Sequence, residues 1–218
     1  MHGFTPFDMI LEAYREGVFP MAETADDEGF AFYKPHMRGL IPILDLHIPR
    51  RLLKNIRTGK FRVSFNYAFE EIIAGCATTT HKREKTWINA PIQYIFNMLH
   101  TQGHAHSLEV WHDDRLAGGI YGLAIGAVFC GESMVSFERD ASKVALVYLC
   151  AVLWKAGFTT LDTQFINPHL LQFGAYEIPQ EQYESLIKIE MDKLVSIQDA
   201  VNIGLENVLA EYLKHRGL

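Results

Sequence analysis

The chain has 218 residues, of which 49% are hydrophobic and 21% are charged, as in an ordinary globular protein. Its net charge of −6 excludes general adhesion to nucleic acids, so any RNA contact must come from a local basic patch. Three cysteines without a CxxC spacing indicate a reducing compartment, and no apolar run reaches the roughly 20 residues of a membrane span, so we expect a cytoplasmic protein that binds no membrane.

The elements predicted for the first part of the chain are short. Helical spacing and helix-start residues predict helices over residues 5–16, 49–56, 67–76 and 90–101. Alternation of apolar and polar residues predicts a strand over residues 61–65. Prolines at positions 20, 35 and 42 predict irregular structure over residues 18–48.

Basic residues gather in two places along this part. The stretch 46–69 has no acidic residue and carries Arg50, Arg51, Lys54, Arg57, Lys60 and Arg62. A second cluster, just before Trp87, consists of Lys82, Arg83 and Lys85. Cations beside an aromatic side chain suit a single-stranded RNA end, because the ring stacks on a base and the cations bind phosphates. Solvated helix faces and a core tryptophan are equally open alternatives.

The second part of the chain predicts a sheet. Three successive strands are expected over residues 107–111, 116–125 and 127–134, then a helix over 142–156 and a further strand over 158–165. Short helices follow over 167–172 and 179–188, and the residues after 190 predict a polar amphipathic helix or a loose tail. Strands, a helix and another strand in this order indicate a mixed sheet with helices packed on it, an α+β fold.

Two carboxylates stand in apolar surroundings. Glu132 comes directly after the uncharged run 118–131, and an ionised group out of water must be paired or functional. Asp162 lies within a predicted strand, where alternation places it on the same face as Gln164. Such conflicts between residue type and surroundings are expected at functional sites, although a neighbouring cap that satisfies Asp162 is the alternative.

Three other patterns have a chemical and a structural interpretation. His104 and His106 would share one face of a strand, as two metal ligands do, but no third ligand is evident and a polar turn is favoured. Cys130 suggests a thiol nucleophile, but no histidine is placed next to it, so a buried thiol is favoured. The glycines between 118 and 131 lack a phosphate-loop spacing, which favours bulges or close backbone approach.

Several longer segments are specific as a set, in order and in spacing, from about residue 5 to about residue 188. They are Tyr14–Pro20, Phe65–Phe69, Thr86–Ile88, Gly103–Trp111, Gly118–Leu146 with its Gly131–Met134, Leu161–Phe165, Phe173–Ala175 and Glu177–Pro179. With these segments the chain resembles the leucyl/phenylalanyl-tRNA–protein transferases of bacteria. Gly-Glu-Ser-Met together with Gly-His-x-His-Ser carries most of this resemblance.

The resemblance implies a fold and an activity. It implies a small N-terminal domain over residues 1–62, a GNAT-like acyltransferase domain with a mixed sheet over 63–190, and a C-terminal helix or tail over 191–218. Members transfer Leu, Phe or Met from the 3′ end of an aminoacyl-tRNA to the N-terminal Arg or Lys of a protein, which marks that protein for degradation. Because the donor is an activated ester, neither a cofactor nor a metal is implied.

The resemblance also implies roles for individual residues. Asp162 and Gln164 are the expected catalytic pair, with Gln164 as the contact to the acceptor amine and Asp162 as the charge behind it. The residues expected to bind the aminoacyl-adenosine end of the donor are Glu132, Trp87, Phe129, Asn167, Ser133 and Met21. The tRNA backbone is expected to meet Lys82, Arg83 and Lys85.

The chain departs from the family pattern at three positions. Met21 stands where many members have a tryptophan that stacks on adenosine, and Val135 and Phe137 replace a Phe and an Arg. Two other functions stay open on the sequence: another GNAT-like transferase, of the peptidoglycan or acyl-CoA type, and a non-catalytic binder of tRNA ends. An acyl-CoA enzyme would show a glycine-containing pyrophosphate loop before the long helix, and residues 138–142 contain no glycine.

Overall fold

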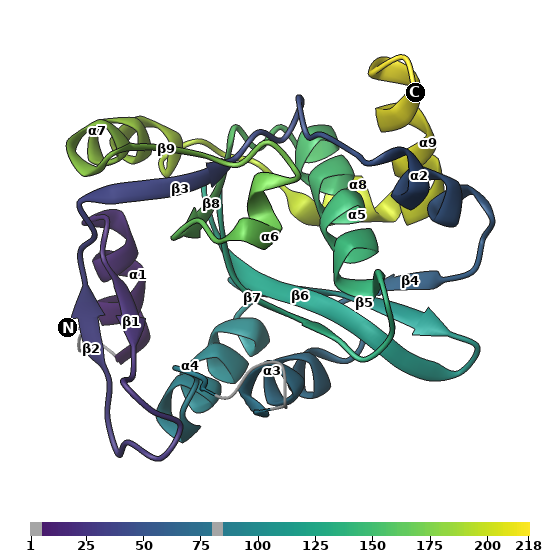
Figure 1. Ribbon diagram of the computed structural model, residues 1–218. Coiled ribbons are helices and arrows are strands. Elements are labelled where there is room, and N and C mark those ends of the chain that lie inside the picture. The colour runs from purple at the N-terminus through teal and green to yellow at the C-terminus, as the bar shows by residue number, and fades with distance from the viewer. Residues whose placement is uncertain (1–5, 80–84) are drawn as a thin grey trace.

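A seven-stranded mixed sheet organises the part of the chain that this computed structural model describes, residues 6–79 and 85–218 (Figure 1). Its strand order is β4–β5–β6–β7–β8–β3–β9, and a separate hairpin pairs β1 with β2. The strands are β1 (Phe19–Met21), β2 (Ala31–Tyr33), β3 (Met37–Ile41), β4 (Arg62–Phe65), β5 (Ala105–His112), β6 (Arg115–Ile125), β7 (Val128–Ser136), β8 (Thr160–Gln164) and β9 (Tyr176–Pro179). Neighbouring strands pair antiparallel except β7 and β8, which are parallel.

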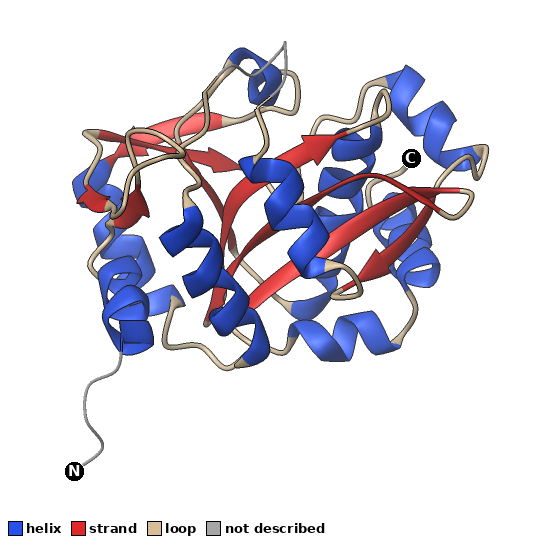
Figure 2. Ribbon diagram, turned by 90° about the horizontal axis from the view of Figure 1, so that it is seen from below, coloured by secondary structure: helices blue, strands red, loops and turns tan. Residues whose placement is uncertain are grey.

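Helices cover both faces of the sheet (Figures 1 and 2). The long helix α5 lies on one face together with α2, α8 and α9, and α3 and α4 lie on the other. Each face has its own cluster of buried apolar side chains. The helices are α1 (Pro6–Arg15), α2 (Arg50–Arg57), α3 (Phe69–Ala77), α4 (Ala90–Thr101), α5 (Ala141–Ala156), α6 (Pro168–Leu171), α7 (Gln180–Glu190), α8 (Ile197–Asn202) and α9 (Leu205–His215).

Most of the predicted elements are present, and the α+β class with a mixed sheet is confirmed. The helix predicted over 142–156 is α5, and the three successive strands are β5, β6 and β7 with ends shifted by one or two residues. The C-terminal residues are helical, because α9 packs Val208, Leu209 and Tyr212 into the core beside α5. In residues 6–79 and 85–218 no helix is both long and apolar enough to cross a membrane.

The expectation of irregular structure over residues 18–48 was wrong. This segment forms β1, β2 and β3, and β3 lies inside the main sheet, between β8 and β9. Pro35 and Pro42 flank β3 rather than interrupt it, so they do not remove hydrogen bonds from the strand. The division into domains at residues 62 and 190 stays a prediction, as does the GNAT-like character of the larger part.

Candidate active site

The strands β7 and β8 separate where the candidate site lies. Their parallel pairing spans three residue pairs and ends where Cys130 faces Asp162. Beyond this point β7 continues to Ser136, whereas β8 ends at Gln164. A cavity of about 370 Å³ is lined by both diverging segments, residues 131–134 of β7 and 163–165 of β8 and the loop after it. The end of strand pairing therefore makes room for a ligand in the middle of the sheet.

Glu132 is the extra residue of a β-bulge on β7. In the pairing with β6, Gly131 faces Gly122 and Ser133 faces Tyr121, so Glu132 has no partner residue between them. A bulge of this kind re-aims the side chain of the extra residue and bends the strand. This geometry explains how a carboxylate within a buried strand comes to face a cavity.

A second irregularity lies across the cavity, on β8. In the pairing with β3, Asp162 faces Leu40 and Gln164 faces Gly39, which leaves Thr163 without a partner. Gln164 itself has φ = 56°, a left-handed conformation that few residues other than glycine, asparagine and aspartate adopt. Backbone strain of this kind persists where the surroundings hold it, and it gathers at functional sites.

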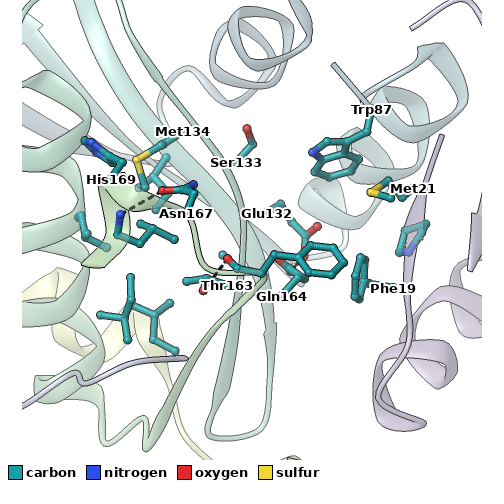
Figure 3. Close-up of a pocket in the computed structure, with 18 residues that line it drawn as sticks. Phe19, Met21, Trp87, Glu132, Ser133, Met134, Thr163, Gln164, Asn167 and His169 are labelled. Carbon is teal, nitrogen blue, oxygen red and sulfur yellow. Dashed lines mark hydrogen bonds between the residues drawn. The ribbon is translucent and has the colours of Figure 1, made fainter. Parts of the chain in front are cut away.

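The cavity has two chemically different ends with a polar middle (Figure 3). Trp87, Met21 and Phe19 lie at one end, and Met134 and His169 lie near the other. Glu132 and Gln164 lie between them. The remaining apolar lining comes from Ile41, Ile120, Leu146, Leu161 and Leu170. A flat aromatic wall suits a nucleobase and an aliphatic wall suits a hydrophobic side chain.

Glu132 is held by one of its two carboxylate oxygens. Its Oε1 accepts hydrogen bonds from the Tyr14 hydroxyl at 2.7 Å and from Gln164 Nε2 at 3.1 Å. Within the described residues, no side chain or backbone group donates a hydrogen bond to Oε2. Burial raises the pKa of Glu132 to about 8, against the opposing effect of the Tyr14 hydrogen bond. The site thus holds a carboxyl group whose pKa is raised to about 8 and whose Oε2 accepts no hydrogen bond from the described residues.

Asp162 is fully buried and does not line the cavity. Its Oδ1 accepts hydrogen bonds from Arg38 Nε and from the Gln164 backbone N–H, both at 2.8 Å. Its Oδ2 accepts hydrogen bonds from Arg38 Nη2 at 2.6 Å and from the Tyr183 hydroxyl at 2.8 Å. A carboxylate has about four acceptor positions, so these four donors saturate it.

Arg38 is the important site residue that the sequence analysis missed. It is fully buried, forms a two-point ion pair with Asp162, and donates a third hydrogen bond to the carbonyl of Gly17. Its guanidinium lies 4.8 Å from the ring centre of Phe19 and 4.4 Å from that of Tyr183. A lone arginine within the apolar run of β3 was the available signal, but the neighbouring prolines led to a prediction of irregular structure.

The other predicted donor-site residues divide into two groups. Trp87, Met21, Ser133 and Asn167 line the cavity, and their contact with the donor stays a prediction. The Oδ1 atom of Asn167 accepts a hydrogen bond from the Leu170 N–H and so caps α6, which leaves its Nδ2 available to a ligand.

Phe129 lies elsewhere, buried in the core with its ring 6.4 Å from that of Phe158. It precedes the point where β7 and β8 separate, so the structure does not bring it to the cavity wall. Of the basic cluster before Trp87, Lys85 is exposed, whereas Lys82 and Arg83 lie outside the described residues.

Comparison with known proteins gives one consistent family. A family model described as leucyl/phenylalanyl-tRNA protein transferase matches residues 40–188. A protein of Novosphingobium aromaticivorans named leucyl/phenylalanyl-tRNA–protein transferase is 46% identical over 92% of this chain and 79% of its own length. A protein of the same name from Nitrobacter winogradskyi is 46% identical over 85% of this chain and 82% of its own length.

A solved structure is also similar in part. The crystal structure of a conserved protein of unknown function from Bacteroides thetaiotaomicron superposes with a TM-score of 0.41 at 7% identity. The match covers 75% of this chain and 58% of that protein.

Proposed function

Because the chain belongs to the leucyl/phenylalanyl-tRNA–protein transferase family, it is an aminoacyltransferase, and we propose its donors, its acceptors and the role of its product as follows. It transfers Leu, Phe or Met from the 3′ end of an aminoacyl-tRNA to the N-terminal Arg or Lys of a protein. The new peptide bond marks the acceptor for degradation, and the reaction takes place in the cytoplasm. The observation that carries this proposal is a cavity that combines an aromatic end, an aliphatic lining and a carboxyl group between Trp87 and Met134.

The donor brings its own activation, since an aminoacyl ester reacts with an amine without ATP. The acceptor α-amine has a pKa of about 7.7–8.0 and is mostly protonated at neutral pH. The enzyme must therefore hold the amine beside the ester carbonyl, help to remove its proton and stabilise the oxyanion. We assign the contact with the amine to Gln164 and the charge behind it to Asp162, whose carboxylate receives the Gln164 backbone N–H at 2.8 Å.

The lining of the cavity suits both parts of the donor's reactive end. Trp87 and Met21 offer an aromatic ring and a polarisable thioether to the terminal adenine. The aliphatic residues Ile120, Leu146 and Leu161 offer an apolar surface to the amino-acid side chain. An apolar pocket separates side chains by only about 1–3 kcal/mol per methylene, so several hydrophobic amino acids are expected as donors.

An exposed basic helix supports a contact with the body of the tRNA. Arg50, Lys54 and Arg57 follow an i, i+4, i+7 spacing on α2, which places them on one face of the helix. All three side chains are exposed, and within residues 6–79 and 85–218 none of them forms an ion pair. We propose that this face, the α2 face, binds tRNA phosphates together with Lys85.

One assay tests the proposed function directly. Labelled Leu-tRNA and Phe-tRNA are supplied with a peptide that begins with Arg and a matched peptide that begins with Ala. We expect transfer to the Arg peptide and much weaker transfer to the Ala peptide. Absence of transfer to either peptide contradicts the proposal, and equal transfer to both contradicts the acceptor assignment. Trp87→Ala should weaken donor binding, whereas Tyr94→Ala, an exposed aromatic of α4 outside the cavity, is the matched control.

A further inference from the structure

We propose that Glu132 takes the proton from the acceptor amine, and that Asp162 is a positioning residue that holds Gln164 and accepts no proton from the substrate. This inference rests on the proposed function and reverses the roles that the sequence analysis expected for the two carboxylates. Three observations carry it: the saturation of Asp162, the free oxygen of Glu132, and the position of Glu132 within the cavity.

Asp162 has no acceptor position left for a substrate proton. Arg38, Tyr183 and the Gln164 backbone provide four donors to its two oxygens, at 2.6–2.8 Å. Its side chain is 0% exposed and is absent from the cavity lining. A proton could reach it only if the ion pair with Arg38 opened, which would leave a buried guanidinium without its partner.

Glu132 lies in the cavity and has an oxygen that can accept a proton, whereas Asp162 has neither property. Among the described residues that line the cavity, it is the one carboxylate. Tyr14 and Gln164 hold its Oε1, which fixes the carboxyl group and leaves Oε2 to receive a proton. His169 also lines the cavity, but it lies toward the end opposite Trp87, on the far side of Asn167 from Gln164 (Figure 3).

The surroundings of Glu132 set its proton affinity. The titratable or charged groups that act on it or on its immediate neighbours are Tyr14 from α1, Arg38 from β3, Tyr121 from β6, Cys130 from β7, Asp162 from β8 and Tyr183 from α7. Burial is the largest effect and raises the pKa of Glu132 to about 8. A general base works best with a pKa near the working pH, and the amine it serves has a pKa of about 7.7–8.0.

In the proposed reaction, Glu132 takes up one proton and later returns it to the leaving group. The neutral amine attacks the ester carbonyl, the C–N bond forms, and the nitrogen becomes positively charged. Oε2 of ionised Glu132 takes one proton from this nitrogen. The ester C–O bond then breaks, and the ribose oxygen leaves with the proton that Glu132 returns. An ester and an amine thus become an amide and an alcohol, and Glu132 ends ionised, as it began.

The test compares two isosteric variants, Glu132→Gln and Asp162→Asn, over a range of Leu-tRNA concentrations up to saturation, with the Arg peptide saturating throughout. A glutamine at position 132 still accepts the hydrogen bonds from Tyr14 and Gln164 but cannot take a proton. We expect its kcat to fall by at least about 100-fold while the KM for the donor changes little. Asp162→Asn should keep a pH-dependent rate. The acid limb of its pH–rate profile should move to lower pH, because the charge of Asp162 raises the pKa of Glu132.

Chemical rescue supplies a second, independent readout. Formate added to Glu132→Ala should restore part of the rate, since the truncated side chain leaves space beside the cavity. Formate added to Asp162→Ala should restore nothing, because that position is closed to solvent. Unchanged kcat with a raised donor KM in Glu132→Gln would overturn the proposal and leave Glu132 as a donor-binding residue. Rescue of Asp162→Ala would overturn it as well.

The unaltered protein separates this proposal from the proposed function. If it transfers no amino acid to any acceptor, the proposed function fails and the inference fails with it. If it transfers normally and Glu132→Gln does so too, the inference alone fails. Tyr14→Phe gives a finer check: it removes a hydrogen bond that lowers the pKa of Glu132, so the acid limb of kcat should move to higher pH. A uniform loss of rate without that movement would contradict the role of Glu132.

Discussion

At the scale of single residues, the site depends on one ion pair in the interior. Arg38 and Asp162 are both 0% exposed in their side chains, and they connect β3 to β8. Removing one partner of such a pair leaves an uncompensated buried charge. The same pair also orders Gln164, whose backbone N–H is bound to Asp162 and whose side chain reaches Glu132. The stability of the fold and the geometry of the candidate site therefore depend on the same contacts.

Arg38→Met tests this dependence. We expect the free energy of unfolding to fall by about 3–5 kcal/mol, because the carboxylate of Asp162 stays buried without its partner. The measurement is equilibrium unfolding in urea. The matched control is Arg15→Met, which breaks the ion pair with Asp192 at a surface where the two side chains are 39% and 74% exposed. The control should cost about 0–1 kcal/mol, and an equal cost for both variants would contradict the account.

Glu132 gives a pH dependence of stability whose sign follows from its raised pKa. The folded state holds the Glu132 proton up to about pH 8, whereas the unfolded chain loses it at about pH 4.3. Between these values the folded state binds more protons, so stability falls as pH rises through this window. Glu132→Gln removes this effect, and we expect it to be more stable than the unaltered protein at pH 8 but not at pH 4. Urea unfolding at the two pH values measures the difference.

At the scale of elements, the bulge on β7 depends on glycines that let strands approach closely. A Cβ atom on Gly122 would collide with the carbonyl of Cys130 and the ring of Phe129, directly beside the bulged Glu132. Gly122 belongs to β6, the antiparallel partner of the bulged strand. The path of β7 at the site is therefore set by the absence of a side chain on its neighbour.

Gly122→Ala should disturb this arrangement. The added methyl group must displace backbone, so we expect a loss of about 1–3 kcal/mol of stability. Activity should fall further than stability alone explains, because Glu132 moves with β7. Thermal unfolding and the transfer assay at a temperature where the variant is folded separate the two effects. Gly29→Ala is the control, since a Cβ there meets nothing within 4 Å; a Gly122 variant that behaves like it would refute the argument.

At the scale of the whole molecule, a net-acidic protein must bind a polyanion. The net charge is −6, yet the α2 face carries exposed cations without acidic partners in the described chain. In the proposed function the α2 face binds the phosphates of the tRNA, and the acidic remainder of the protein suits the proposed acceptor with its cationic N-terminus.

Replacing Arg50, Lys54 and Arg57 with alanine tests whether the α2 face binds the tRNA. We expect the donor KM to rise and its dependence on salt to weaken by roughly 0.7–0.9 in log–log slope per lost phosphate contact. An aminoacyl ester of adenosine, which lacks the tRNA body, should react unchanged. Lys188→Ala on α7, which lies far from α2 in Figure 1, is the control and should leave the salt slope as it was. An unaltered slope in the triple variant would show that the α2 face does not bind tRNA.

Much of the fold could be predicted from local patterns. The helix α5, the strands β5 to β7 and the helix α4 follow from periodicity and end signals that lie within the elements themselves. The strand β3 could not be predicted in this way, because its place between β8 and β9 depends on partners more than a hundred residues away in sequence. Its prolines were visible, but only the pairing shows that they lie at its ends.

The sequence by itself determined the family, the α+β class and the polar residues that line the cavity: Glu132, Ser133, Gln164 and Asn167. Only the tertiary structure decided which carboxylate faces the cavity and which is paired with Arg38 away from it. The reason is physical: a residue's type is local, but its burial, its hydrogen-bond partners and therefore its proton affinity depend on strands and helices distant in sequence. For Glu132 and Asp162 these surroundings differ, and so do the roles that two similar side chains can take.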